Sequence, residues 1–263
     1  MLRRAYIVEL VGTFGLVFFS AAVVCMNYLA IPASTQPLGT TPLYQNQAGL
    51  VGIALAQGLI FAVLLTLTVP ISGGYLNPAI AITLWTFNRL DARRASWLIG
   101  AQLVGAFLAG AALRFTFDMD LLNFTHFGTP HLNSQAYREL RQSALYGGSA
   151  LELVLTFFVV FAIFGAAGEK IASWMGGAVL AAAVLVGFPV TGAALNPARW
   201  FGTVIWENWL SGTNLGRSPF DDLLVYLAGP ILGALLAGGF CFLFYVPGRS
   251  VKTEPPNQGI IKK

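Results

Sequence analysis

Long apolar segments alternate with short polar ones along most of the chain. Six of them are long enough to cross a bilayer as a helix, which takes about 20 residues: residues 5–28, 48–69, 95–113, 145–167, 174–190 and 223–245. The first segment contains Glu9 and is longer than the apolar part of a cleaved signal peptide. The pattern therefore predicts an all-α membrane protein with six transmembrane helices.

Composition agrees with an integral membrane protein. Apolar residues make up 56% of the chain and charged residues 10%, whereas a soluble domain has about 25% charged residues. The sequence has no Gly-rich nucleotide loop, no Ser/His/Asp arrangement and no metal-ligand cluster, so we expect no enzymatic activity, no cofactor and no bound metal. Cys25 and Cys241 lie inside apolar segments and are expected to be buried rather than disulfide-bonded. His126 and His131 are expected to be solvated in the polar loop 114–144.

Positive charges are distributed unevenly between the two ends of the predicted helices. On one side fall 10 of the 15 cations: Arg3, Arg4, Arg89, Arg93, Arg94, Lys170, Arg249, Lys252, Lys262 and Lys263. The positive-inside rule assigns this side, and with it both termini, to the cytoplasm. The net charge of +4 follows from this topology and requires no nucleic-acid partner. We predict one domain, 1–246, followed by a disordered cytoplasmic tail, 247–263.

Two shorter apolar segments each begin with the triplet Asn-Pro-Ala. Residues 72–79 read SGGYLNPA and residues 191–198 read TGAALNPA. Asn is a favoured helix N-cap and Pro a favoured first helical residue, so the triplets predict two re-entrant half-helices, at 79–87 and 198–206. The lead-in segments are predicted to be extended backbone, which is tolerated at membrane depth where it lines a watery cavity or is buried in protein: residues 71–76 and 190–195.

The two halves of the chain resemble one another. Three matches occur in the same order: ELVGTF (9–14) with ELVLTF (152–157), SGGYLNPA with TGAALNPA, and GAFLAG (105–110) with GALLAG (233–238). They indicate a duplication, with repeats over about 5–117 and 145–246. Because each repeat has three spanning helices, the second enters the membrane from the opposite face, and the repeats are inverted. The Gly/Ala matches predict close helix packing.

The inverted repeat brings the two half-helix N-termini together near the bilayer midplane. Each N-terminus carries roughly +0.5 of an elementary charge, so a pore between them disfavours cations, including protons. The amides of Asn77 and Asn196 can donate hydrogen bonds to a permeating oxygen atom. A single triplet is equally consistent with a cap on a buried turn, but two related copies favour a pore.

On these motifs the chain resembles the aquaporin, or major intrinsic protein, family over about residues 5–246. The resemblance implies a homotetramer in the lipid bilayer. Each subunit has its own pore for water and, in some branches, for glycerol and other small neutral solutes. The pore motifs are then Asn77, Pro78, Ala79, Asn196, Pro197 and Ala198. The pore-lining backbone carbonyls are expected at Gly73, Gly74, Tyr75, Gly192 and Ala194.

The resemblance also implies a selectivity filter of Gln57, Val184, Ala193 and Arg199. Typical water-selective members have an aromatic residue and a histidine at the first two positions, and glycerol-conducting members use aromatic residues and glycine. This chain has neither set, and its Val, Ala and Arg are similar to part of the plant nodulin-like branch. The small Val184 and Ala193 leave the pore wide, Arg199 disfavours cations, and Gln57 either faces the pore or makes a helix–helix hydrogen bond. We expect water to pass, with ammonia, glycerol or urea.

Glu9 and Glu152 occupy matching positions in the two repeats. Carboxylates at membrane depth often mark function, and a proton relay is one interpretation. The resemblance favours another, in which each carboxylate accepts hydrogen bonds from the backbone N–H groups of a re-entrant loop and anchors it.

Other functions remain compatible with the pattern. A glycerol-type facilitator with little water selectivity is the nearest. A coupled secondary transporter also uses inverted repeats and broken helices, but it needs an ion or proton site, for which Glu9 and Glu152 are the candidates. A structural membrane protein with a nearly closed pore is the third.

Overall fold

The computed structural model describes residues 2–29, 47–133, 143–169, 171–210 and 218–245. Its helices are α1 (Leu2–Leu29), α2 (Gln47–Thr68), α3 (Pro78–Thr86), α4 (Ala92–Thr116), α5 (Met119–Phe124), η3 (His126–Gly128), α7 (Ala144–Gly165), α8 (Ala172–Thr191), α9 (Pro197–Leu210), η4 (Pro219–Asp222) and α10 (Leu223–Phe244). Six helices are long and apolar enough to cross a membrane, which confirms the predicted all-α architecture. The predicted tail, 247–263, lies outside the described residues.

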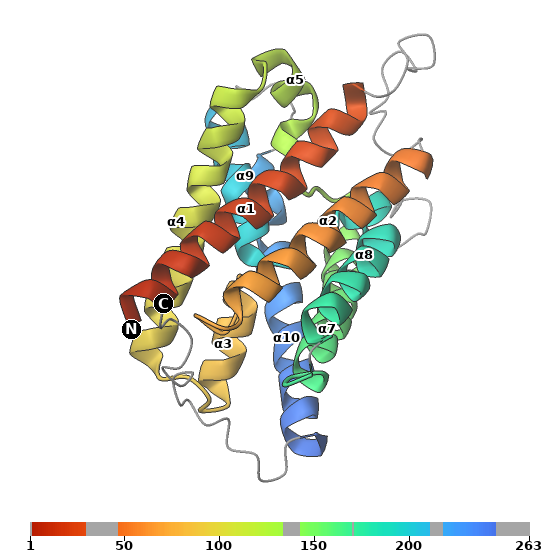
Figure 1. Ribbon diagram of the computed structural model, residues 1–263. Helices are drawn as coiled ribbons and strands as arrows, with labels where there is room; N and C mark the ends of the chain where they lie inside the picture. The colour runs from red at the N-terminus through yellow and green to blue at the C-terminus, as the bar shows by residue number, and fades with distance from the viewer. Residues whose placement is uncertain (1, 30–46, 134–142, 170, 211–217, 246–263) are drawn as a thin grey trace.

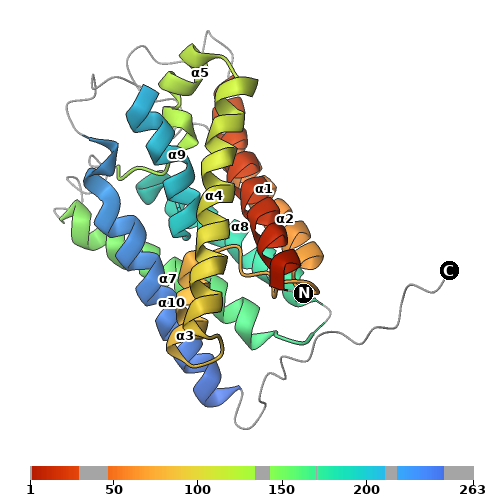
Figure 2. The same cartoon turned by 90° about the vertical axis from the view of Figure 1, so that its left-hand side faces the viewer.

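The six long helices form a bundle around the two short helices α3 and α9 (Figure 1). The beginning of α1 and the end of α10 lie at one end of the bundle, and α5 lies at the other (Figure 2). Helix α3 occupies the half nearer the start of α1, and α9 the half nearer α5. These two ends are the N-terminal end and the α5 end of the bundle.

The packing of the helices repeats between the two halves of the chain. Helix α1 packs against α2 and α4, and α7 packs in the same way against α8 and α10. The short helix α3 contacts α4 and α10, and α9 contacts the same two helices. Each contact in the first half therefore has a counterpart in the second half, as expected for a duplicated sequence.

Glycine allows the closest helix crossings in both halves. A Cβ atom at Gly105 of α4 would collide with the carbonyl of Leu10 in α1. A Cβ atom at Gly233 of α10 would collide with the carbonyl of Leu153 in α7. The GAFLAG and GALLAG segments thus lie where the backbones approach each other, which confirms the predicted close packing.

The outer surface of the bundle is apolar. Large side chains on the long helices are exposed, among them Ile7, Leu59, Trp97, Phe158 and Leu236. A soluble monomer rarely exposes apolar patches of this extent, whereas a lipid-facing surface requires them. The buried polar residues lie inside, around α3 and α9, where the candidate site is found.

The extended lead-ins are shorter than predicted. Helix α8 continues to Thr191, so residues 190 and 191 are helical, and Gly192 ends the helix by donating its N–H to the Phe188 carbonyl at 3.0 Å. After α2, Ile71 and Ser72 donate to the Thr68 carbonyl at 3.0 and 2.9 Å. These hydrogen bonds prolong the helical path, and the irregular backbone begins only at Gly73 and Gly192.

Candidate functional site

Asn77 and Asn196 cap the two half-helices in the same way. The Oδ1 atom of Asn77 accepts the N–H of Ala79 at 2.9 Å, and Oδ1 of Asn196 accepts the N–H of Ala198 at 2.9 Å. Each cap satisfies one of the N–H groups left free at a helix start. Because the oxygen is used within its own helix, the amide nitrogen faces away from that helix.

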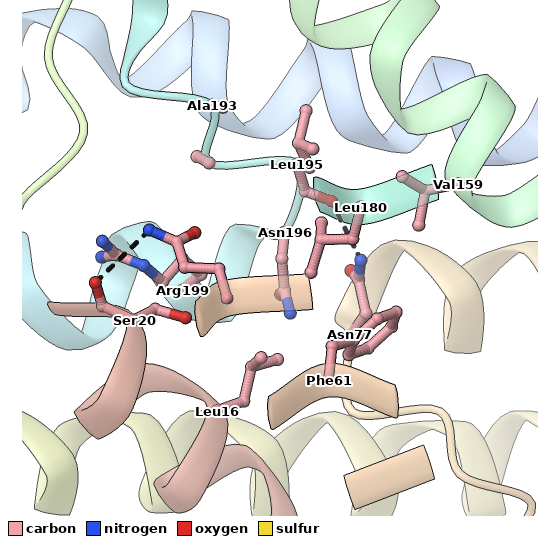
Figure 3. Close-up of a pocket in the computed structure, with 12 residues that line it drawn as sticks. Leu16, Ser20, Phe61, Asn77, Val159, Leu180, Ala193, Leu195, Asn196 and Arg199 are labelled. Atoms are coloured by element: carbon pink, nitrogen blue, oxygen red, sulfur yellow. Dashed lines mark hydrogen bonds between the residues drawn. The ribbon is translucent and has the colours of Figure 1, made fainter. Parts of the chain in front are cut away.

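The two amide nitrogens join the N-termini of α3 and α9. Asn77 Nδ2 donates to the Leu195 carbonyl at 3.0 Å, drawn as a dashed line in Figure 3, and Asn196 Nδ2 donates to the Leu76 carbonyl at 2.8 Å. An asparagine amide has two N–H groups. Each side chain therefore keeps a second donor beside the cavity that both residues line.

The backbone before each cap adopts left-handed conformations. Leu76, Ala193 and Leu195 have φ angles of 47°, 48° and 54°. Such angles are uncommon outside glycine, and each costs of order 1–3 kcal/mol unless the surroundings hold it. The two buried carboxylates provide that support.

Glu9 anchors the first loop. Its Oε1 accepts the backbone N–H of Tyr75 at 2.9 Å and the Ser72 hydroxyl at 2.6 Å. Its Oε2 accepts the backbone N–H of Leu76 and the Gln102 side-chain amide, both at 2.7 Å. All these donors converge on one fully buried carboxylate, so the loop conformation depends on it.

Glu152 anchors the second loop with the matching set of contacts. Its Oε1 accepts the Thr191 hydroxyl at 2.7 Å and the Ala194 N–H at 3.0 Å, and its Oε2 accepts the Leu195 N–H at 2.7 Å. Position 230, which corresponds to Gln102 in the GAFLAG/GALLAG alignment, is a proline. Glu152 therefore lacks the side-chain amide that serves Glu9.

A narrow cavity lies between the two loops and the surrounding helices (Figure 3). Its volume is about 30 Å³, enough for about two water molecules. Its lining combines apolar and polar side chains. The lining residues are Leu16, Ser20, Gln57, Phe61, Asn77, Val159, Leu180, Ala193, Ala194, Leu195, Asn196 and Arg199.

Arg199 places a guanidinium group at this cavity. Its Nη2 donates to the Gly128 carbonyl at 2.7 Å, and Nη1 lies 3.4 Å from the Thr203 hydroxyl. Among the described residues, nothing accepts a hydrogen bond from its buried Nε. The side chain is only 4% exposed, so its charge is held in a fixed position.

The other three positions of the predicted filter differ in their surroundings. Gln57 and Ala193 line the cavity with Arg199. Gln57 also donates its Nε2 to the Ser20 carbonyl of α1 at 3.4 Å, so both interpretations of this residue apply at once. Val184 does not line this cavity; it is fully buried in an apolar cluster that includes Ala193.

The carbonyls predicted to line the pore belong to residues with different surroundings. Among the described residues, none donates a hydrogen bond to the carbonyls of Gly73, Gly74, Tyr75, Gly192 or Ala194. Of these residues, only Ala194 borders the cavity itself. Gly192 packs against Pro130 instead, where a Cβ atom would lie 2.7 Å from the Pro130 Cα.

The two histidines are only partly exposed and are paired with a buried carboxylate, whereas the sequence analysis expected solvated loop residues. His126 Nδ1 lies 3.0 Å from Oε1 of Glu207, and His131 Nε2 lies 2.8 Å from Oε2 of the same carboxylate. Burial lowers the pKa of His131, but Asp222 and Glu207 outweigh it and raise this pKa to about 9. A buried carboxylate in α9 holds both rings because it needs partners to compensate its charge.

The sequence analysis missed this group because Glu207 is 76 residues from His131. One signal was present: Glu207 is the only charged residue between Arg199 and Arg217. A lone carboxylate in a buried half-helix requires a partner, and the two histidines are the nearest unassigned candidates on the same side. The described part of the chain also shows Cys25 and Cys241 as free, buried thiols, as predicted.

Comparison with known proteins identifies related chains. The profile of the family described as "Major intrinsic protein" matches residues 1–242. The chain is 31% identical over 250 residues to the "Probable aquaporin NIP4-2" of Arabidopsis thaliana, covering 92% of this chain and 75% of that one. It is 32% identical over 212 residues to human "Aquaporin-5", covering 77% and 72%.

A solved structure has the same fold. The X-ray structure of the aquaglyceroporin from Plasmodium falciparum superposes with a TM-score of 0.73, covering 94% of this chain and 98% of that one. The two sequences are 23% identical, so this likeness is evidence for the fold alone.

Proposed function

We propose, from the premise that the chain belongs to the major intrinsic protein family, that it is a passive membrane channel for water and small neutral solutes. Family membership also agrees with the prediction of a channel rather than an enzyme. The single observation that carries the proposal is the pair of reciprocal hydrogen bonds between Asn77 and Leu195 and between Asn196 and Leu76. They bring two half-helix N-termini and two amide donors to one cavity.

This arrangement favours neutral solutes and disfavours cations. Each half-helix N-terminus presents roughly +0.5 of an elementary charge, and Arg199 adds a full positive charge at the same cavity. A neutral solute accepts hydrogen bonds from the free N–H groups of Asn77 and Asn196 and replaces the water it loses on entry. A cation cannot accept hydrogen bonds from these donors, so nothing in the cavity replaces the water molecules it loses on entry.

The composition of the filter supports a broader solute range than water alone. Ala193, a small residue, borders the cavity beside Gln57 and Arg199, whereas Val184 lies in the apolar cluster outside the cavity lining. Gln57 presents a polar amide while tied to the Ser20 carbonyl. We propose that water passes together with glycerol, ammonia or urea. Nodulin-26 of Glycine max and plant proteins named aquaporins are among the relatives.

Glu9 and Glu152 serve as anchors in this proposal. A coupled transporter would need one of them as an ion or proton site at membrane depth. Both are occupied by hydroxyl and backbone donors of the loops that they hold. Their contacts support the scaffold role.

The membrane arrangement follows from the same premise. We propose one channel domain, 1–246, of two inverted repeats, assembled as a homotetramer in which every subunit has its own pore. Both termini are placed in the cytoplasm, since Arg3, Arg4, Arg89, Arg93 and Arg94 lie toward the N-terminal end. The α5 end then faces the exterior.

Stopped-flow light scattering on proteoliposomes tests the proposal. Vesicles are first shrunk with sucrose and then with glycerol. We expect shrinkage several times faster than in empty vesicles, followed by rapid re-swelling in glycerol. Asn196→Ala should slow both phases, whereas Asn123→Ala, at an exposed asparagine on α5, should leave them unchanged. Shrinkage no faster than in empty vesicles would overturn the proposal.

A further inference from the structure

His126, His131 and Glu207 form a polar group that solute conduction does not use. One nitrogen from each ring and one carboxylate oxygen all lie within 4.8 Å of one another. The Glu207 side chain is fully buried, whereas each histidine side chain is 23% exposed and open to water. These are the only two histidines in the chain, so any histidine chemistry is confined to this place.

The spacing of the three side chains suits a metal ion. Zinc binds histidine nitrogen and carboxylate oxygen at about 2.0–2.2 Å, which separates tetrahedral ligand atoms by about 3.3 Å. The histidine–carboxylate distances are 3.0 Å for His126 and 2.8 Å for His131. Both distances lie within about 0.5 Å of that separation, and all three ligand atoms lie within 4.8 Å of one another, so the three side chains can converge on a single ion.

The carboxylate of Asp222 lies beside His131 on the side away from Glu207. A metal-ligating histidine usually directs its second ring nitrogen at a carboxylate or carbonyl, which fixes the ring and raises its basicity. His131 Nδ1 lies 3.8 Å from Oδ2 of Asp222, on the ring side opposite Glu207. Asp222 is itself buried and accepts the Leu132 N–H at 3.3 Å, so its position is fixed.

We propose that His126, His131 and Glu207 bind a divalent transition-metal ion of the zinc class at the α5 end of the channel, with water completing the coordination. Two imidazoles and one carboxylate suit Zn²⁺, Cu²⁺ or Ni²⁺, whereas Mg²⁺ and Ca²⁺ prefer oxygen ligands alone. The ion takes the place of the protons that join the rings to Glu207, so binding releases protons.

The ion would join two parts of the channel mouth. His126 and His131 flank Gly128, whose carbonyl holds Arg199 at 2.7 Å. Glu207 and Arg199 both belong to α9. A bound ion therefore ties both ends of segment 126–131 to the helix that carries Arg199. It stabilises the mouth of the channel and fixes the carbonyl that positions the guanidinium group.

Metal content and thermal unfolding of the detergent-solubilised full chain test the site. The protein is prepared without a polyhistidine tag, loaded with ZnCl₂ and desalted. We expect one zinc per chain, and Co²⁺ substitution should produce the intense visible absorption of a tetrahedral nitrogen–oxygen site. At Zn²⁺ about 100-fold above Kd, the melting temperature should rise by about 5 °C. The test needs no flux, so it stands apart from the channel function.

Variants separate this site from adventitious binding. His126→Asn/His131→Asn should lower zinc retention at least tenfold, and Asp222→Asn, which changes only the supporting carboxylate, should weaken binding by about 10- to 100-fold. Asp120→Asn removes an exposed carboxylate of α5 and should retain the ion. Absence of zinc and of the Co²⁺ spectrum in the wild-type chain would overturn the proposal, even if a variant fails to fold. Equal zinc retention by a folded double-histidine variant would overturn it as well.

Discussion

Arg199 is held at the cavity by a single strong contact from outside its own helix. The Gly128 carbonyl accepts its Nη2 at 2.7 Å, and its Nε has no hydrogen-bond partner among the described residues. The buried charge is therefore only partly compensated by the protein. This residual charge faces the cavity, where it acts on whatever enters.

Removing the charge should relax cation exclusion. We expect Arg199→Ala to raise proton or potassium leakage while water still passes, because the positive potential at the cavity falls and its width increases. Arg199→Lys retains the charge and should leak less than the alanine variant. Vesicles loaded with a pH-sensitive dye measure the leak, and identical leakage in wild type and Arg199→Ala would count against Arg199 as a filter residue.

The carboxylate anchors should dominate the stability of the loops. Glu9→Gln replaces an acceptor of four donors with a group that itself carries N–H bonds, and it should cost at least about 3 kcal/mol. Gln102→Leu removes one of the four donors and should cost less. Thermal unfolding in detergent measures both changes. A Glu9→Gln protein as stable as wild type would show that the anchor is dispensable.

Sequence reasoning reached the residues that carry a local signal. Asn77, Asn196 and Arg199 stand in short motifs whose capping chemistry is readable from neighbouring residues. The side-chain partners of Glu9 and Glu207 carry no such local signal. Gln102 and the two histidines lie 76–93 residues along the chain from the carboxylates that they contact. Such pairs form only when helices pack, and no spacing along the chain predicts them.

At the scale of helices, glycine determines how closely the spans approach. Gly105 and Gly233 lie where α4 crosses α1 and α10 crosses α7. The six spans and the two half-helices were predictable because apolar length and the Asn-Pro cap are local properties. The end of α8 was not, since its last turn depends on the Gly192 cap and on Glu152 from another helix.

A matched pair of substitutions in α4 tests the packing. Gly105→Ala should destabilise the protein by about 1–3 kcal/mol, because its Cβ atom meets the Leu10 carbonyl in α1. Gly100→Ala, in the same helix with open space around it, should be neutral or stabilise by about 0.5–1 kcal/mol. The melting temperatures of the two variants are compared with that of the wild type. Equal effects would show that the α1–α4 crossing is not limited by side-chain volume.

The whole molecule has two chemically different ends. The N-terminal end carries Arg89 between α3 and α4 and Arg93 and Arg94 in the first turn of α4. The α5 end carries Asp118, Asp120 and the group of His126, His131 and Glu207. This asymmetry underlies the proposed orientation, in which the histidine–carboxylate group faces the exterior.

Labelling in intact cells tests the orientation. Cysteine is introduced at two exposed positions, Asp120→Cys at the α5 end and Arg93→Cys at the N-terminal end. A membrane-impermeant maleimide should label position 120 directly and position 93 only after permeabilisation. The native thiols are buried and give little background. The reverse pattern would invert the proposed topology.

The central claim is that the cavity between the two half-helices conducts water and rejects protons. The most direct measurement follows water and proton flux in the same wild-type proteoliposomes, using light scattering for volume and an entrapped dye for pH. We predict water flux several times that of empty vesicles, with proton flux no greater than theirs. Proton flux that rises together with water flux would contradict the account, because the half-helix dipoles and Arg199 would then provide no barrier.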